Sequence, residues 1–234
     1  MNEKKFINEL ELLGITLSDN QLLQFQKYYE LLVEWNEKIN LTTIIEKEQV
    51  YLKHFYDSAT LIRAIDLSNE QSLCDVGTGA GFPGIVLKII YPNLKITLID
   101  SLNKRIIFLN EVIRVLELKD IVALHERGED YAIKNREKYD VVTARALANL
   151  PVLLEICIPL LKVGKTFIPM KANISQEIIM AQSALTMLSC TIEKEINFSL
   201  PIENSLRTLL VIKKEKITNG RYPRKYSEIK KKHL

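Results

Sequence analysis

Apolar side chains in the first 70 residues recur at intervals of three and four, which is the spacing of a buried helix face. The clearest run is Leu22, Phe25, Tyr29, Leu32, Asn36 and Ile39. Ser18 and Gln21 have the spacing of a capping box at the start of that helix. Because no Gly or Pro occurs between residues 15 and 76, we predict two or three helices here, with another around residues 46–65.

From residue 72 the pattern changes to short apolar runs that alternate with helical segments. The predicted strands are residues 73–76, 96–100, 122–125, 141–143 and 166–169. The predicted helices are residues 85–91, 104–116, 148–161 and 174–188. This alternation predicts a parallel sheet with helices on both faces. Two final strand-like runs, residues 191–200 and 207–213, are too close for a crossover helix, so we expect an antiparallel hairpin at the end of the sheet.

Composition places the chain among globular proteins. Of its 234 residues, 47% are hydrophobic and 26% are charged. No apolar stretch approaches the roughly 18 residues of a membrane helix, and the N-terminus lacks the pattern of a secretory signal. The cysteines Cys74, Cys157 and Cys190 are odd in number and widely spaced, which argues against a disulfide framework and favours the cytoplasm. The three histidines share no ligand spacing, so we expect no metal.

Charge is distributed unevenly along the chain, whose net charge is +3. Residues 213–234 contain nine basic and two acidic residues, whereas the rest of the chain is net negative. Such a tail is typical either of a polyanion contact or of a solvated terminus. We therefore divide the chain into a helical region (1–70), an α/β domain (71–214) and a basic tail (215–234).

A glycine-rich turn carries the strongest chemical signal. Four of the eight glycines, Gly77, Gly79, Gly81 and Gly84, follow the first predicted strand and open a helix. There the backbone must turn sharply and approach a ligand closely. Asp100 ends the second predicted strand, where an acid can accept hydrogen bonds from both ribose hydroxyls of a nucleoside.

Two cofactors compete for this turn. The spacing of Gly79, Gly81 and Gly84 satisfies the dinucleotide fingerprint of an NAD-dependent oxidoreductase. Gly77, Gly79 and Gly81 preceded by Asp75 instead form the pattern of S-adenosylmethionine methyltransferases. Asp75 favours the second, because its carboxylate can orient the methionine ammonium but would repel a pyrophosphate, and an NAD-dependent oxidoreductase is kept as the alternative.

The combined motifs resemble the RsmG family, formerly GidB, of bacterial small-subunit ribosomal RNA methyltransferases, which modify guanine N7. The resemblance covers nearly the whole chain, although Thr78 stands where serine is more usual and Ala172 where glycine is common. The matching segments are residues 35–36, 40–42, 54, 57–58, 75–84, 100–101, 104–105, 108–109, 127–129, 145–146, 171 and 222–224.

The resemblance implies a Rossmann-like class I methyltransferase sheet with an N-terminal helical cap. It implies S-adenosylmethionine as cofactor and 16S rRNA, free or in an assembling small subunit, as partner. A monomer that binds neither membrane nor DNA is expected. The expected cofactor contacts, together with those that the turn itself suggests, are Asp75, Gly77, Gly79, Gly81, Phe82, Asp100, Ser101, Leu102, Gly128, Glu129 and Arg145.

Arg145 and Lys171 are the expected catalytic residues. Arg145 follows the fourth predicted strand, where its guanidinium can bind a phosphate or the target base, or can pair with Asp75 or Glu129. Expected RNA contacts are Lys104, Arg105, Arg221, Arg224 and Lys225, with Tyr222 and Tyr226 as stacking surfaces.

The target atom that the resemblance implies, guanine N7, is consistent with what the sequence lacks. After the fourth strand there is no Asn/Asp-Pro-Pro-Tyr motif, and Cys157 sits among apolar residues as a core residue rather than a nucleophile. Guanine N7 needs neither, because its lone pair is nucleophilic and carries no proton. His54 is interpreted as a hydrogen-bonded structural residue. A non-catalytic RNA-binding protein with the same fold remains an alternative.

Overall fold

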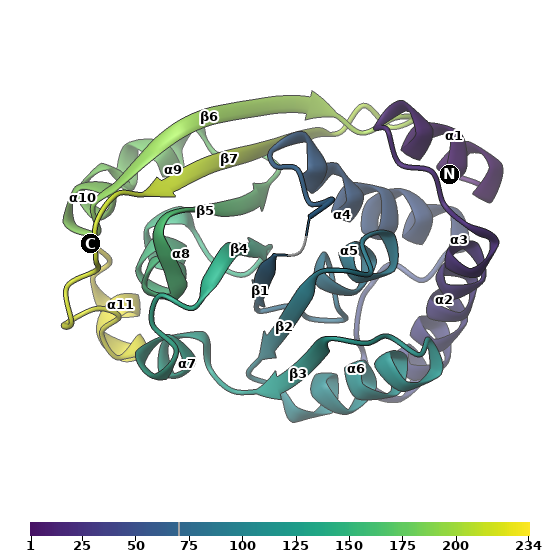
Figure 1. Ribbon diagram of the computed structural model, residues 1–234, viewed down its shortest axis with the longest axis horizontal. Coiled ribbons are helices and arrows are strands. Elements are labelled where there is room, and N and C mark those ends of the chain that lie inside the picture. Colours follow the sequence, from purple (N-terminus) through teal and green to yellow (C-terminus); the bar gives the residue numbers. More distant parts are fainter. Residues whose placement is uncertain (70) are drawn as a thin grey trace.

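The computed structural model describes residues 1–69 and 71–234, which contain one seven-stranded sheet in the order β3-β2-β1-β4-β5-β7-β6 (Figure 1). Strands β1 to β5 pair in parallel, and β7 lies antiparallel between β5 and β6. The predicted parallel sheet and terminal hairpin are therefore confirmed. The strands are β1 (Ser72–Val76), β2 (Lys95–Asp100), β3 (Ile121–His125), β4 (Tyr139–Arg145), β5 (Leu161–Lys171), β6 (Cys190–Ser199) and β7 (Leu206–Lys214).

Helices cover both faces of the sheet, as Figure 1 shows. Alternate strand residues face opposite layers, so Leu73 belongs to one hydrophobic core and Cys74 to the other. One layer holds α1 (Glu3–Leu12), α2 (Asp19–Ile39), α3 (Lys47–Val50), η1 (Tyr51–Tyr56), α4 (Asp57–Ala59), η2 (Thr60–Arg63), α5 (Gly84–Ile90) and α6 (Asn103–Val115). The other holds α7 (Gly128–Lys134), α8 (Leu150–Cys157), η3 (Ile158–Leu160), α9 (Ser175–Met180), α10 (Gln182–Met187) and α11 (Tyr226–Lys231).

The N-terminal helices share a single core with the sheet rather than forming one of their own. The predicted capping box at Ser18 and Gln21 is present, and the Gln21 amide also donates to the carbonyl of Ile89 at 2.6 Å. The buried Tyr28 hydroxyl of α2 donates to the carbonyl of Ala80 at 2.5 Å. The helical cap is thereby tied directly to the glycine-rich turn.

Several element boundaries differ from the sequence prediction. The helix predicted at 148–161 ends at Cys157 and tightens into η3, which contains Pro159 and so lacks one amide donor. The helix predicted at 174–188 is two helices that meet at the buried Ala181. Strand β5 begins at Leu161, earlier than predicted, and the seven-residue helix α7 was not predicted.

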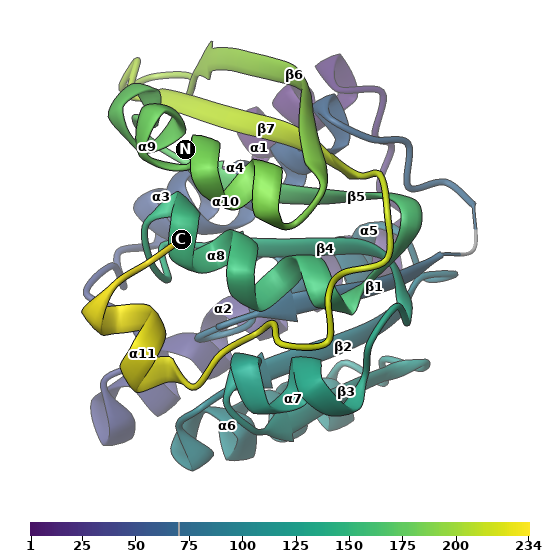
Figure 2. The same cartoon turned by 90° about the vertical axis from the view of Figure 1, so that its left-hand side faces the viewer.

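The basic tail is folded onto the protein. Figure 2 shows it leaving β7 and crossing to α11 beside α7 and α8. Tyr222 and Ile229 are buried, and the Arg136 guanidinium donates to the carbonyls of Thr218 and Tyr222, each at 2.5 Å. The interpretation as a solvated terminus is therefore wrong for this segment.

Arg224 fixes the tail through the carboxylate of Glu155, which is completely buried in α8. Its Nε and Nη2 atoms donate to the two carboxylate oxygens at 2.7 Å each, and its backbone amide adds a third bond at 3.0 Å.

Across the described residues, no helix is long and apolar enough to span a membrane.

We predict that Arg224→Ala destabilises the protein by about 3–5 kcal/mol, because it leaves the Glu155 carboxylate buried without its charged partner. Arg221→Ala is the matched control, since Arg221 is exposed and its guanidinium only overlies the ring of Tyr222 at 4.8 Å. Its cost should stay below about 1 kcal/mol. Urea unfolding measures both, and equal costs would contradict this account of the tail.

Candidate active site

The buried carboxylate of Asp75 holds the glycine-rich turn in place. This residue is fully buried, and its Oδ2 atom accepts hydrogen bonds from Thr78 Oγ1 at 2.7 Å and from the Gly84 amide at 2.9 Å. Burial raises the pKa of Asp75 to about 6, against the effect of these donors. Its Oδ1 atom has no hydrogen-bond partner within the described residues. Asp75 thus holds the turn through two hydrogen bonds, and its other carboxylate oxygen can still accept one.

Two glycines of this turn adopt left-handed backbone conformations. Gly77 has a φ of +70° and Gly79 a φ of +62°, values that other residues rarely adopt. A Cβ on Gly79 would meet nothing within 4 Å, whereas the space above Gly77 holds the side chain of Leu147. Gly81 faces Tyr28, away from this open side.

The carboxyl ends of β1, β2 and β3 enclose a cavity of about 150 Å³ with the segment after β4. We call it the first pocket. Its lining residues are Val76, Gly77, Asp100, Ser101, Arg105, Glu126, Arg127, Gly128, Glu129, Leu147, Ala148, Ile156 and Tyr226.

Asp100 is the buried acid of the first pocket. Its carboxylate accepts hydrogen bonds from the Gly79 amide at 3.0 Å and the Leu102 amide at 2.9 Å. The Arg105 guanidinium donates to the same carboxylate at 3.0 Å. Arg105, which was predicted to bind RNA, therefore lies against the acid expected to hold the ribose.

At the other side of this pocket α7 begins with Gly128 and Glu129. A Cβ on Gly128 would lie within 3 Å of Ile156 and Val76, so this backbone packs closely against the pocket wall. Glu129 is buried, and burial raises the pKa of its carboxyl. Ser101 lines the pocket and is exposed, whereas Leu102, which is also exposed, is not among the lining residues.

The first pocket fits a nucleoside cofactor in its chemistry. It offers glycine backbone, a buried acid at the end of the second strand and a second acid after the third. Its volume is below the roughly 300–1,000 Å³ of most small-molecule sites. Arg105 and Leu147 line it with side chains that are 31% and 44% exposed.

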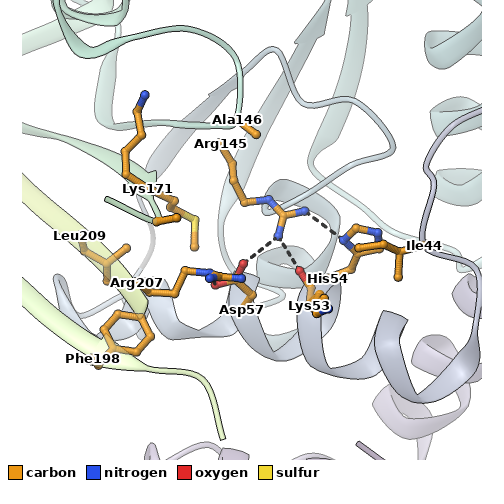
Figure 3. A pocket seen from close by; sticks show the side chains of 12 residues that line it. Ile44, Lys53, His54, Asp57, Arg145, Ala146, Lys171, Phe198, Arg207 and Leu209 are labelled. Atoms are coloured by element: carbon orange, nitrogen blue, oxygen red, sulfur yellow. Dashed lines mark hydrogen bonds and ion pairs between the residues drawn. The ribbon is translucent and has the colours of Figure 1, made fainter. Parts of the chain in front are cut away.

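A second pocket of about 330 Å³ lies at the end of β4 (Figure 3). Arg145 projects into it and donates to the carbonyl of Lys53 at 3.1 Å and to Asp57 Oδ2 at 3.4 Å. The other oxygen of Asp57 accepts from Arg207 Nε at 3.0 Å. Arg145 therefore pairs with Asp57, and neither Asp75 nor Glu129, the two partners considered from the sequence, holds it.

His54 packs beside this ion-paired group. Its Nδ1 atom lies 3.4 Å from Arg145 Nη2, its Nε2 atom lies 3.0 Å from Thr42 Oγ1, and its ring stacks on Phe82 at 4.5 Å. Burial, helped by the charge of Arg145, lowers the pKa of His54 to about 3. Phe82 also supports the Arg145 guanidinium, which lies 5.2 Å from its ring. Phe82 thus contacts the residues of the second pocket.

Lys171 points away from the group around Asp57, as Figure 3 shows. Its Nζ atom donates to the carbonyl of Ala148 at 2.6 Å and pairs with Glu177 at 2.8 Å. Glu177 also accepts from the amide of Leu150 at 2.6 Å. The geometry of Lys171 is that of a residue that holds the segment after β4 in place.

The expected RNA contacts lie in different surroundings. Lys104, Arg221 and Lys225 are exposed, whereas Arg224 is paired with the buried Glu155. Tyr222 is buried and offers no stacking surface. The three described cysteines are buried and free, and Cys157 is the core residue that the sequence predicted.

Comparison with known proteins gives a consistent picture. The family model described as GidB, rRNA small subunit methyltransferase G, matches residues 21–206. The protein named ribosomal RNA small subunit methyltransferase G from Bacillus cytotoxicus is 53% identical over 228 residues, which are 96% of this chain and 95% of that protein. The protein of the same name from Bacillus thuringiensis is also 53% identical, over the same share of each chain.

The chain belongs to the GidB family. Solved structures show the same fold at low identity. A SAM-dependent methyltransferase from Aquifex aeolicus matches with a TM-score of 0.52 and 17% identity, over 70% of this chain and 93% of that one. The YcgJ protein from Bacillus subtilis matches with a TM-score of 0.55 and 10% identity, over 70% of this chain and 100% of that one. The expected methyltransferase fold is therefore confirmed.

In this GidB-family chain the sequence did not single out Asp57 and Arg207 as partners of Arg145. Asp57 carried a signal, because the residue pair 57–58 matched the family pattern together with His54. No sequence pattern pointed to Arg207, since it lies 150 residues from Asp57 along the chain.

We predict that His54 makes the stability of the protein depend on pH. The folded pKa of about 3 lies below the ordinary value of about 6.5. As the pH falls from about 6 to about 4, the unfolded chain therefore takes up a proton that the folded state does not. Relative to His54→Gln, the wild type should lose about 1.4 kcal/mol of unfolding free energy per pH unit. Parallel stability curves for the two proteins would contradict a neutral, buried His54.

Proposed function

We propose that this chain transfers a methyl group from S-adenosylmethionine to N7 of a guanine in 16S rRNA. Membership of the GidB family makes it an S-adenosylmethionine-dependent methyltransferase of small-subunit rRNA. The single observation that supports the geometry of transfer is that two pockets share one segment. Arg145 and Ala146 line the second pocket, and Leu147 and Ala148 line the first.

The first pocket suits the cofactor. Asp100 would hold the ribose hydroxyls, Gly77 and Gly79 would let the backbone approach the ligand, and Glu129 would face the adenine edge. The unpartnered Oδ1 of Asp75, which is fully buried at the turn and does not line the pocket, would be an acceptor for the methionine ammonium. When bound, the cofactor supplies a methyl group on a sulfonium, which is a good leaving group.

The second pocket suits a guanine nucleotide. Arg145 and Arg207 carry two positive charges and Asp57 one negative charge, so the group has a surplus of one positive charge for a phosphate. A guanidinium group can also donate a hydrogen bond to guanine O6 alone, which leaves the N7 lone pair free. The apolar part of the lining, which can pack against a base, is Ile44, Met170, Phe198 and Leu209.

N7 methylation fits a site without a free base. The new bond forms from the N7 lone pair to the methyl carbon as the carbon–sulfur bond breaks, and the positive charge moves to the guanine ring. No proton is transferred. His54 is neutral with both ring nitrogens in contact with partners, and the Lys171 ammonium is paired with Glu177. The proposed role of the second pocket is to position the base in line with the methyl group.

The RNA itself is proposed to dock through exposed cations near the first pocket. Lys104 lies in the first turn of α6, next to the pocket residue Arg105, and Lys225 directly precedes Tyr226 and α11. Such contacts give affinity without sequence specificity, so recognition of one guanine requires folded rRNA. We propose that the partner is 16S rRNA, free or in an assembling small subunit, and that the protein acts as a cytoplasmic monomer.

The proposal is tested by incubating the protein with labelled S-adenosylmethionine and small-subunit rRNA or particles from cells that lack it. Reduction and aniline cleavage, which cut RNA at N7-methylguanine, then locate the product. We expect cleavage at one guanine. Label on another base atom, or no transfer at all, would overturn the proposed reaction.

We predict that the two pockets respond separately to substitution. Asp100→Asn should weaken cofactor binding about tenfold to hundredfold, because charge-assisted hydrogen bonds to the ribose are lost. Arg207→Gln should leave cofactor affinity unchanged and raise KM for the RNA by a similar factor.

Calorimetry and methylation kinetics measure the two effects. Lys213→Ala is the control for Arg207, since Lys213 lies at the other end of β7 and pairs with Glu193. It should change neither quantity. If Arg207→Gln weakened cofactor binding as much as Asp100→Asn, the division between the pockets would be wrong.

A further inference from the structure

The C-terminal tail forms part of the wall of the first pocket. Tyr226, the first residue of α11, lines this pocket together with Asp100 and Glu129. Its side chain comes from a segment that the sequence suggested would contact only RNA. The ring is 39% exposed, so it borders the cavity without being part of a hydrophobic core.

The position of Tyr226 is fixed by the anchors on both sides of it. Two residues earlier, Arg224 is bonded through its side chain and backbone to the buried Glu155. Three residues later, Ile229 is fully buried against the same layer. Arg224 Nη2 also donates to the carbonyl of Lys232 at 3.0 Å, which closes the end of α11.

The pocket wall beside Tyr226 is organised by the same contacts. Glu155 is followed directly by Ile156, which lines the pocket, so the Arg224 ion pair holds both parts of this wall together. The Arg127 guanidinium lies 5.9 Å from the Tyr226 ring and 3.9 Å from Glu129. The ring is thus linked to the acid that is proposed to face the adenine edge.

We infer that Tyr226 is a cofactor-binding residue whose ring contacts the adenosine part of S-adenosylmethionine. This inference rests on the proposed role of the first pocket. An aromatic ring held at the border of a nucleoside pocket offers a flat apolar surface to the base. The tail therefore completes the cofactor site in addition to carrying charges.

The test is calorimetric titration of the full chain with S-adenosylhomocysteine and with 5′-methylthioadenosine, which lacks the amino-acid part. Tyr226→Ala should weaken both ligands by the same factor, about threefold to tenfold, because the lost contact is to adenosine. Tyr226→Phe keeps the ring and should bind like the wild type. Ser227→Ala, an exposed neighbour on α11, is the matched control and should change nothing.

Unchanged affinity in Tyr226→Ala would overturn the inference, as would equal losses in the Ala and Phe variants. A loss confined to RNA binding would overturn it in favour of a stacking contact with RNA. If Tyr226→Ala does not fold, an NMR measurement on the wild type tests the inference instead. Nuclear Overhauser effects are then expected between the Tyr226 ring and adenine H2 and H8, and Tyr226→Phe identifies which signals belong to this ring. Their absence would overturn the inference. If the wild type bound neither ligand, the proposed function would fail as well, which distinguishes the two failures.

Discussion

The buried carboxylate of Asp57 joins three parts of this protein that are distant in sequence. It begins α4 in the helical cap, and it accepts hydrogen bonds from Arg145 at the end of β4 and from Arg207 at the start of β7. Because Asp57 is only 5% exposed, its negative charge is compensated by these two guanidinium groups rather than by water. Removing a partner from such a group is costly, so the cap, the parallel strands and the hairpin are constrained to one arrangement around the second pocket.

A second constraint acts on the segment that follows Arg145. Lys171 holds the carbonyl of Ala148 and, through Glu177, the amide of Leu150. The segment is therefore fixed at both ends, with one pocket on each side. In the proposed reaction the base and the sulfonium meet at this segment, while the rest of each ligand stays in its own pocket. The chemistry needs alignment and exclusion of water more than it needs proton transfer.

Periodicity and the glycine-rich turn were enough to predict the sheet, the terminal hairpin and the position of Asp100, because these features are local along the chain. The short helix α7 escaped prediction because its seven residues are largely polar and show no apolar repeat. Arg207 and the fold of the tail escaped it because their partners, Asp57 and Glu155, are 150 and 69 residues away. Basic residues such as Arg105 and Arg224 suggested RNA contacts, yet the structure pairs both with acids, which the sequence alone does not reveal.

The central claim is that the methyl donor and the acceptor base occupy the two pockets on either side of the segment after β4. A crystal structure of the protein with S-adenosylhomocysteine and guanosine monophosphate tests it most directly. The account predicts the base beside Arg145 and Arg207, with N7 directed at the sulfur and with room for a methyl group about 3–3.5 Å from N7. A base bound elsewhere, or an N7 atom that faces away from the sulfur in the second pocket, would contradict it.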